Sequence, residues 1–187
     1  IIVDNVGNQE QLENLQVLTK EKLGLDFDLG KVLFYQSKVK VVKGGETRQE
    51  SVLAGLSAIE NHNYVMIHDG ARPNINLDRL LNLKKAVLNG PATLFTPATE
   101  SVVSFEENHI NAYLDRKMIG FIKTPQAFKV DDIQKAYESA SKHQRHYTDD
   151  ASLLMNELKM SVTLIEDDET NIKLTNQKDI QFMEAIL

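Results

Sequence analysis

The chain has 187 residues, of which 42% are hydrophobic and 26% are charged, and its formal net charge is −6. This length fits one domain with a sizeable core, and the negative charge argues against a general nucleic-acid binder, because a polyanion would be repelled. The chain has no cysteine and no run of about 18 apolar residues, which excludes disulfides, thiolate metal sites and a membrane span, and suits a reducing cytoplasm.

The first half of the chain alternates strand and helix signals. Apolar residues recur at three- and four-residue steps in the helical stretches, and short apolar runs end in glycine or proline turns. Strands are predicted at 1–3, 39–42, 64–68 and 92–96, and helices at 9–23, 49–60 and 76–89. This alternation predicts an α/β fold with a doubly wound, Rossmann-like, mostly parallel sheet, which binds ligands beyond the carboxyl ends of its strands.

The second half begins with a break in this rhythm. Residues 101–128 contain a predicted hairpin with a polar turn, and such an insertion in an α/β domain often serves as a dimerisation arm. Helical signals return at 131–141 and 148–158, followed by a strand at 162–165 and a helix at 176–186. The sequence has no internal repeat or linker, so we expect one domain over 1–187.

A glycine pair precedes the helix predicted at 49–60, in the stretch K-G-G-E-T-R-Q-E-S-V-L-A-G-L. Glycines allow a ligand to approach the backbone closely, and Glu50 or Ser51 can cap the helix. The free N–H groups of a helix N-terminus accept anions or base edges. A plain glycine turn before a capped helix explains the same residues.

Residues 67–73, I-H-D-G-A-R-P, place three polar side chains directly after a strand. Asp69 can hold a divalent cation, and Arg72 can bind a phosphate through two prongs. His68 is expected to pack or hydrogen-bond at the strand end, because no serine–histidine–aspartate spacing recommends it as a catalyst. The alternative is a loop salt bridge with a proline stop.

Three further stretches carry charge. D-R-K-M-I-G-F-I-K-T-P-Q-A-F concentrates Arg116, Lys117 and Lys123, although lysines also protect edge strands. Y-T-D-D-A-S-L predicts a helix capped by Thr148 or Asp149. E-D-D-E-T-N-I-K-L-T sets Lys173 among acids, where a surface ion pair is the simple explanation.

Taken in order, G-G-E-T-R-Q-E-S-V, H-D-G-A-R-P, T-P-Q-A-F, T-D-D-A-S and N-I-K-L-T resemble the successive motifs of the 2-C-methyl-D-erythritol 4-phosphate cytidylyltransferases. The resemblance extends over nearly the whole chain. It implies a nucleotidyltransferase that couples CTP to a sugar-alcohol phosphate with Mg²⁺ as cofactor, giving CDP-methylerythritol and pyrophosphate in non-mevalonate isoprenoid synthesis. It also implies a cytoplasmic homodimer, assembled through the 101–128 arm, whose arm arginine reaches the partner's substrate site.

The resemblance assigns roles residue by residue. The nucleotide-binding set comprises Gly45, Glu46, Gln49, Ser51, Gly70 and Ala71. The substrate-binding set comprises Asp69, Arg72, Ser101, Arg116, Thr124 and Thr148. Asp69 is also the metal ligand, and Asp69, Arg72 and Lys173 form the catalytic set.

Two features depart from the family pattern. The family begins with a strand and a glycine-rich loop that carries an arginine and a lysine, and we expect these to precede Ile1, so that the chain by itself would be inactive. Glu100-Ser101 stands where the family usually has aspartate–threonine, which weakens the assignment of Ser101. Two alternatives stay open: a ribitol 5-phosphate cytidylyltransferase, which T-D-D-A-S disfavours, and a catalytically dead nucleotide-binding dimer.

Overall fold

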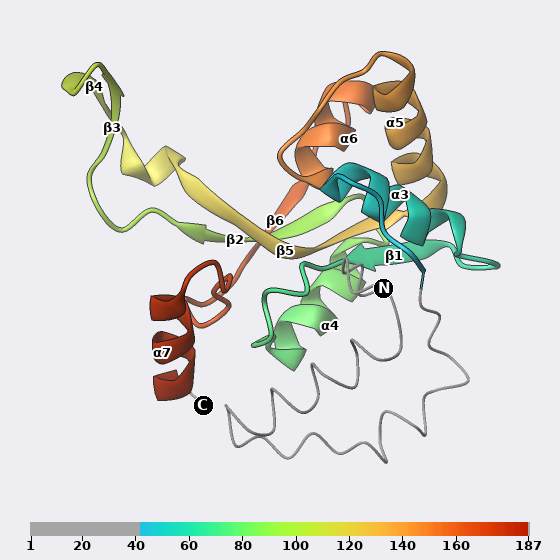
Figure 1. Ribbon diagram of the computed structural model, residues 1–187, viewed down its shortest axis with the longest axis horizontal. Coiled ribbons are helices and arrows are strands. Elements are labelled where there is room, and N and C mark those ends of the chain that lie inside the picture. Colours follow the sequence, from blue (N-terminus) through green and yellow to red (C-terminus); the bar gives the residue numbers. More distant parts are fainter. Residues whose placement is uncertain (1–41, 187) are drawn as a thin grey trace.

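A four-stranded sheet forms the centre of the protein in the computed structural model, which describes residues 42–186 (Figure 1). Its strands are β1 (Tyr64–Ile67), β2 (Ala92–Pro97), β5 (Gly120–Lys129) and β6 (Thr163–Glu166), in the order β1-β5-β2-β6. Strands β2 and β6 pair in parallel, whereas β5 is antiparallel to both of its neighbours. Strands β1, β2 and β6 therefore share one direction, and the sheet is mixed.

The antiparallel strand follows from the connection that precedes it. Between β2 and β5 the chain forms a hairpin of β3 (Val102–Glu106) and β4 (His109–Leu114), then the short 3₁₀ helix η2 (Arg116–Met118). It then returns directly alongside β2, so that Gly120 pairs with Pro97. Antiparallel neighbours need no crossover helix, and this segment contains none.

Helices cover both faces of the sheet. Figure 1 shows α3 (Arg48–Ser57), α5 (Val130–Lys142) and α6 (Asp150–Leu158) on one face, and α4 (Leu77–Ala86) on the other. The last helix, α7 (Gln177–Ile186), follows β6. In the part of the chain that the structure describes, no helix is long and apolar enough to cross a membrane.

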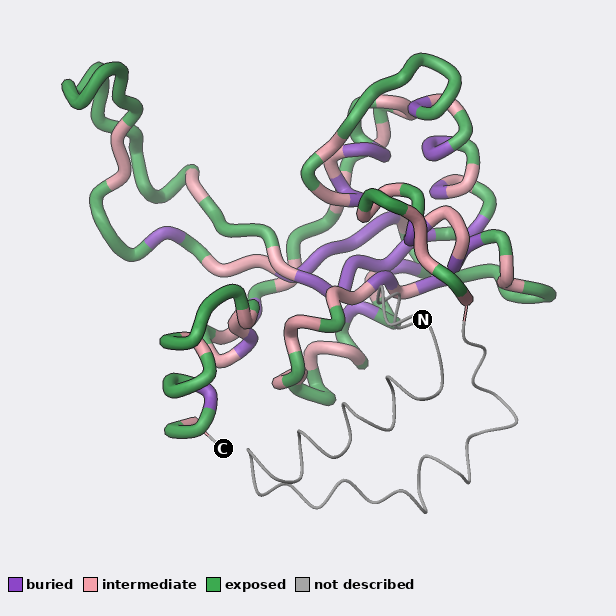
Figure 2. The backbone as a smooth tube through the Cα atoms, in the orientation of Figure 1, coloured by how far each residue is buried: buried purple, intermediate pink, exposed green. Residues whose placement is uncertain are grey.

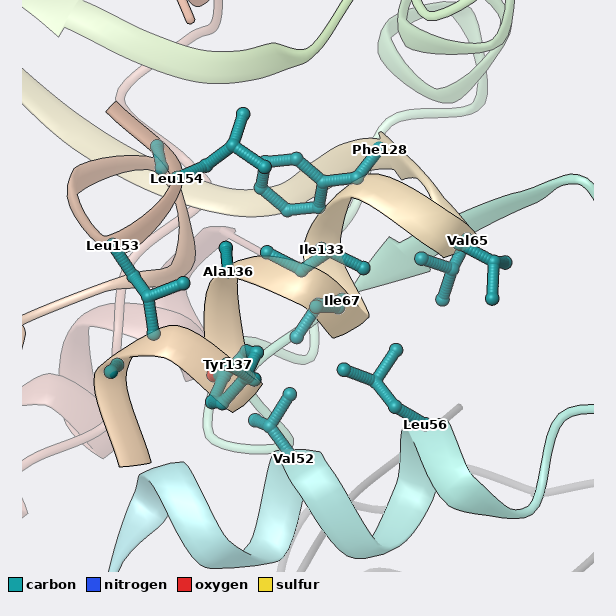
Figure 3. Close-up of a cluster of buried hydrophobic side chains, with 13 residues drawn as sticks. Val52, Leu56, Val65, Ile67, Phe128, Ile133, Ala136, Tyr137, Leu153 and Leu154 are labelled. Atoms are coloured by element: carbon teal, nitrogen blue, oxygen red, sulfur yellow. The ribbon is translucent and has the colours of Figure 1, made fainter. Parts of the chain in front are cut away.

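Two hydrophobic cores lie on opposite faces of the sheet, because successive strand residues point to opposite sides. Phe128 of β5 packs into the core under α3, α5 and α6, while its neighbour Ala127 packs into the core under α4. In Figure 3, side chains from β1, β5 and these three helices point toward one another. The labelled members are Val52, Leu56, Val65, Ile67, Phe128, Ile133, Ala136, Tyr137, Leu153 and Leu154.

The β3–β4 hairpin projects away from the main sheet, and most of it is exposed (Figure 2). The predicted hairpin within 101–128 is thus present. Residues 120–128, however, lie in β5, a central strand of the four-stranded sheet, so the protruding part ends before Gly120. The role of the hairpin in dimerisation stays a prediction.

The other predicted elements agree with the structure within a few residues, except those at 1–3, 9–23 and most of 39–42, which lie outside the described residues. The predicted cap of α3 was wrong. Thr47, rather than Glu50 or Ser51, is the N-cap, and it accepts a hydrogen bond from the Glu50 amide at 3.2 Å. The Glu50 carboxylate returns to the Thr47 amide at 3.0 Å, which completes a capping box. Asp149 caps α6, as predicted.

Candidate functional site

The site lies where β1 and β6 end. Asp69 comes two residues after β1, and the loop with Lys173 follows β6. Between these ends, β5 bulges: Gln126 pairs with Thr93 but Lys123 pairs with Leu94, so Thr124 and Pro125 are extra residues. Proline has no N–H to donate to a ladder, which explains why it is tolerated at this irregular point of a central strand.

The bulge fixes the loop after β1 through the Thr124 hydroxyl. Its oxygen accepts a hydrogen bond from the Asp69 amide at 3.0 Å and lies 3.1 Å from His68 Nδ1. The other ring nitrogen of His68 lies 2.8 Å from the Arg72 carbonyl oxygen. Burial lowers the pKa of His68, more than the Arg72 carbonyl and the Asp69 charge raise it. His68 therefore supports the turn, as the sequence indicated.

Three cationic side chains surround the Asp69 carboxylate. Lys173 Nζ lies 3.1 Å from Asp69 Oδ2, Arg48 Nε lies 3.4 Å from Oδ1, and Arg72 Nε lies 3.7 Å from Oδ2. The structure thus brings together the predicted catalytic residues Asp69, Arg72 and Lys173. Arg48 is an addition that sequence reasoning missed.

The charge of Asp69 is secured by its neighbours. Burial alone would raise the pKa of this carboxyl, but the hydrogen bond from Lys173 and the positive charges of Arg48 and Lys173 hold the pKa below its ordinary value. Asp69 is consequently a carboxylate at neutral pH, with its side chain 15% exposed. It is accessible to a ligand while being held in place.

Arg72 connects the Asp69 loop to the loop that follows β6. One of its terminal nitrogens donates to the Asn171 carbonyl at 2.9 Å, and the backbone of Ala71 accepts from Leu174 at 2.8 Å, which ties the two loops together. The Nε atom of Arg72 is buried and has no hydrogen-bond partner among the described residues. Burial lowers the pKa of Arg72, and the Asp69 charge opposes this shift. The nearest carboxylate oxygen to this Nε is Asp69 Oδ2, at the ion-pair distance of 3.7 Å.

Arg48 joins Asp69 to a second, fully buried carboxylate. Its two terminal nitrogens donate to Asp150 at 3.2 and 2.7 Å, and the Tyr137 hydroxyl also donates to Asp150. Burial lowers the pKa of Arg48, but the hydrogen bond and charge of Asp150 outweigh this effect, so the pKa is raised above its ordinary value and the guanidinium stays charged. The only sequence signal was an arginine one residue inside a capped helix, and nothing in it indicated a partner 102 positions away.

Four of the six predicted nucleotide-binding residues, Gly45, Glu46, Gln49 and Ser51, lie at the start of α3. The Gly45 amide donates to the Ser51 hydroxyl at 3.1 Å, and the Glu46 amide donates to Glu50 at 2.8 Å. A side chain at Gly45 would place a Cβ only 2.2 Å from the Glu50 Cβ, so this position requires glycine. The predicted glycine turn before a capped helix is therefore present, and it ends one residue from Arg48.

Gln49 connects this turn to the segment that precedes α6. Its side chain accepts from the Tyr147 amide at 3.0 Å and donates to the Arg145 carbonyl at 3.2 Å. Thr148, which follows Tyr147 in the chain, is thereby held beside α3, and it is exposed. Gly70 and Ala71 lie in the Asp69 loop itself, so most of the predicted nucleotide and substrate residues share one region.

Three predicted substrate residues lie differently. Ser101 and Arg116 are exposed at the base of the projecting hairpin, and an Arg116 terminal nitrogen donates to the Thr99 carbonyl at 2.8 Å. Within the described residues, no recorded contact joins either one to the Asp69 cluster. Thr124 is only 4% exposed, and its hydroxyl is occupied by the Asp69 loop, which makes it a support of the site.

A metal at this site would find one carboxylate from the protein. Among residues 42–186, no group of three or more histidine, aspartate or glutamate side chains is arranged to hold a metal ion. Asp69 alone is consistent with Mg²⁺, which is commonly held by one or two carboxylates together with phosphate oxygens and water. The surrounding cations suit the phosphates of such a complex.

Comparisons with known proteins show the family of the chain. The family model IspD, 2-C-methyl-D-erythritol 4-phosphate cytidylyltransferase, matches residues 2–187. Two proteins with that name are similar to the chain: one from Shouchella clausii is 39% identical over 90% of this chain and 71% of its own length, and one from Bacillus pumilus is 34% identical over 95% and 78%.

Solved structures give the same result. The structure of 2-C-methyl-D-erythritol 4-phosphate cytidylyltransferase from Thermus thermophilus superimposes with a TM-score of 0.72 at 28% identity, covering 78% of this chain and 71% of that one. The Francisella tularensis structure of the same name has a TM-score of 0.72 at 28% identity, covering 80% and 72%. The family model covers nearly the whole chain, and the chain therefore belongs to the IspD family of 2-C-methyl-D-erythritol 4-phosphate cytidylyltransferases.

Proposed function

We propose that the protein transfers the cytidylyl group of CTP to 2-C-methyl-D-erythritol 4-phosphate, giving CDP-methylerythritol and pyrophosphate for isoprenoid precursor synthesis. The observation that carries this proposal is the convergence of Lys173, Arg48 and Arg72 on the Asp69 carboxylate at the carboxyl ends of β1 and β6. Membership of the IspD family supplies the substrate class. The relatives described above bear the methylerythritol name, which favours this acceptor over ribitol 5-phosphate.

The reaction joins two anions. An oxygen of the alcohol phosphate attacks the α-phosphorus of CTP, a new P–O bond forms, and the bond to pyrophosphate breaks. The protein needs no covalent nucleophile for this step, because positioning and charge neutralisation lower the barrier. Lys173 and Arg72 supply positive charge beside Asp69.

We include Mg²⁺ as the cofactor and Asp69 as its protein ligand. When bound, the ion would supply positive charge that neutralises the phosphates. Asp69 suits this role because it is a carboxylate at neutral pH and is partly exposed. The neighbouring Lys173 donates a hydrogen bond to Asp69 Oδ2 and keeps the Asp69 side chain oriented.

We also propose that the protein works as a cytoplasmic homodimer in which Arg116 completes the partner's substrate site. The hairpin that leads to Arg116 carries large apolar side chains on its surface, including Phe105, Ile110 and Tyr113. Exposed apolar side chains gathered on a projecting hairpin are typical of an interface between subunits. No nucleic-acid or membrane partner is part of this proposal.

The proposal is tested by pyrophosphate release from CTP in the protein made from its complete reading frame. With Mg²⁺, turnover should be faster on methylerythritol phosphate than on ribitol 5-phosphate. Asp69→Asn should abolish turnover and leave the circular dichroism spectrum unchanged, whereas Asp131→Asn, on the exposed surface of α5, should retain normal rates. Faster turnover of ribitol 5-phosphate, or a fully active Asp69→Asn protein, would contradict the proposal.

A further inference from the structure

One guanidinium group lies between two carboxylates that belong to different parts of the fold. Arg48 is the first residue of α3, Asp69 follows β1, and Asp150 is the first residue of α6. The two terminal nitrogens of Arg48 bind Asp150, and its Nε faces Asp69 Oδ1 at 3.4 Å. All three nitrogens are thus used on carboxylate oxygens.

The Asp150 end of this bridge is rigid. Asp150 is 0% exposed, and the Tyr137 hydroxyl from α5 donates to the same oxygen, Oδ1, that receives one Arg48 nitrogen. A buried carboxylate is stable only when it is paired and hydrogen-bonded, so Asp150 holds the Arg48 guanidinium strongly. The guanidinium is planar, and fixing two of its nitrogens therefore also fixes the direction of the third.

The Asp69 end is the exposed one. The Arg48 side chain is 35% exposed and that of Asp69 is 15% exposed, so the bridge runs from the core to the open side of the site. Asp69 has other cationic neighbours, but Lys173 is 44% exposed and contacts the opposite oxygen. Arg72, whose side chain is 12% exposed, also lies on that opposite oxygen, Oδ2, at 3.7 Å. Arg48 is consequently the neighbour that ties the other oxygen, Oδ1, to the buried Asp150.

We propose that Arg48 is a positioning residue for the transfer reaction. Anchored on Asp150, it orients the Asp69 carboxylate relative to the glycine turn before α3, which contains Gly45 and Glu46 of the predicted nucleotide-binding set. This inference rests on the proposed cytidylyltransferase activity and adds a residue to its site. The competing explanation is an ion pair that only holds α3 against α6.

Chemical rescue separates these two explanations. Arg48→Ala should lower kcat/KM by about a hundredfold, because a small misplacement of a catalytic group is costly. Free guanidinium at low, non-denaturing concentration should raise the kcat/KM of Arg48→Ala at least tenfold, because it can bind beside Asp150 in the space that the Arg48 side chain leaves. Methylammonium, which supplies charge without the planar donors, should restore little, and Arg48→Lys should stay poorly active for the same reason.

Two matched variants locate the effect. Arg145→Ala removes another arginine that pairs with a poorly exposed carboxylate, Glu157, but it does not contact Asp69, so its activity should be unchanged and unaffected by guanidinium. The double variant Arg48→Ala/Asp150→Asn should not be rescued by guanidinium, because the carboxylate that binds guanidinium is missing. Thermal unfolding of each variant shows whether it is folded, and if the double variant unfolds, the guanidinium and methylammonium comparison on Arg48→Ala decides.

The outcomes distinguish this inference from the proposed function. If the unaltered protein releases no pyrophosphate with either alcohol phosphate, the proposed function fails. If the unaltered protein is active and folded Arg48→Ala retains its kcat/KM, or if guanidinium and methylammonium rescue it equally, the positioning role is overturned. A lower unfolding temperature with unchanged kcat/KM would identify Arg48 as a purely structural link.

Discussion

Lys173 Nζ lies 3.1 Å from Asp69 Oδ2, although 104 residues separate them in the chain. Lys173 follows β6 and Asp69 follows β1, and these strands run in the same direction with two others between them. Their carboxyl ends open on the same edge of the sheet, which is where α/β sheets bind ligands. This pair is the centre of the candidate site.

Replacing Lys173 by methionine should lower turnover by about a hundredfold, because the positive charge would be missing where phosphate charge is neutralised. Lys173→Arg should retain more activity, since it keeps the charge. Steady-state pyrophosphate release measures both. Lys178→Met, an exposed lysine on α7, is the control, and equal losses in Lys173→Met and Lys178→Met would contradict a role at the site.

Gly45→Ala should disturb the turn before α3. The added Cβ would approach the Glu50 Cβ to 2.2 Å, so Glu50 must move and its capping hydrogen bonds to Glu46 and Thr47 weaken. We expect the free energy of unfolding to fall by about 1 kcal/mol, as for other lost caps, and the KM for CTP to rise. Urea unfolding and initial rates test this, and an unchanged KM would separate the turn from nucleotide binding.

Arg116→Ala should raise the KM for the alcohol phosphate more than the KM for CTP. Arg116 is exposed at the base of the hairpin, and the proposed dimer places it in the partner's site. Mixing this variant with the impaired Lys173→Met protein should restore part of the activity, because one site of a mixed dimer would be intact. Failure of complementation between two proteins shown to exchange subunits would count against a shared site.

Tyr137→Phe should destabilise the protein by about 1 to 3 kcal/mol, the usual range when a buried acceptor loses a hydrogen bond. Tyr137 is 2% exposed, and its hydroxyl donates to the fully buried Asp150. Urea unfolding monitored by circular dichroism measures the change. Tyr113→Phe, on the exposed face of β4, should have no effect, and equal stability of the two variants would show that Asp150 does not depend on this donor.

Acid sensitivity should depend on Glu157. Hydrogen bonds from the Ser139 and Tyr147 hydroxyls and from Arg145 lower the pKa of Glu157 from its usual value of 4.5 to about 2. A depressed pKa contributes stability that is complete above 4.5 and is lost as pH falls through 2.

Glu157→Gln should therefore be less stable than the unaltered protein at pH 7 and should lose less stability on acidification through this window. Denaturant unfolding at several pH values measures the slope, and Glu138→Gln, an exposed carboxylate on α5, is the control. An unchanged slope in Glu157→Gln would contradict the assignment.

Much of the fold was predictable because local patterns suffice for single elements. Alternating strands and helices predicted an α/β sheet, and the polar turn within 101–128 predicted the hairpin. The position of β5 was not predictable, since residues 120–128 read as part of the inserted arm. Its place between β1 and β2 depends on pairing with strands that lie far away in the sequence. Pro125, at the bulge, also argues against a central strand when only the sequence is considered.

The sequence by itself determined the candidate site residues: Asp69, Arg72 and Lys173 stand in recognisable motifs at strand ends, and the parallel direction of those strands brings them together. The tertiary structure alone decided how they are held. It buries Asp150 under α3 and α5, gives it Arg48 and Tyr137, and turns Thr124 inward to the Asp69 loop. The reason is physical: a buried charge requires partners, and those partners come from helices and strands that only packing brings into contact.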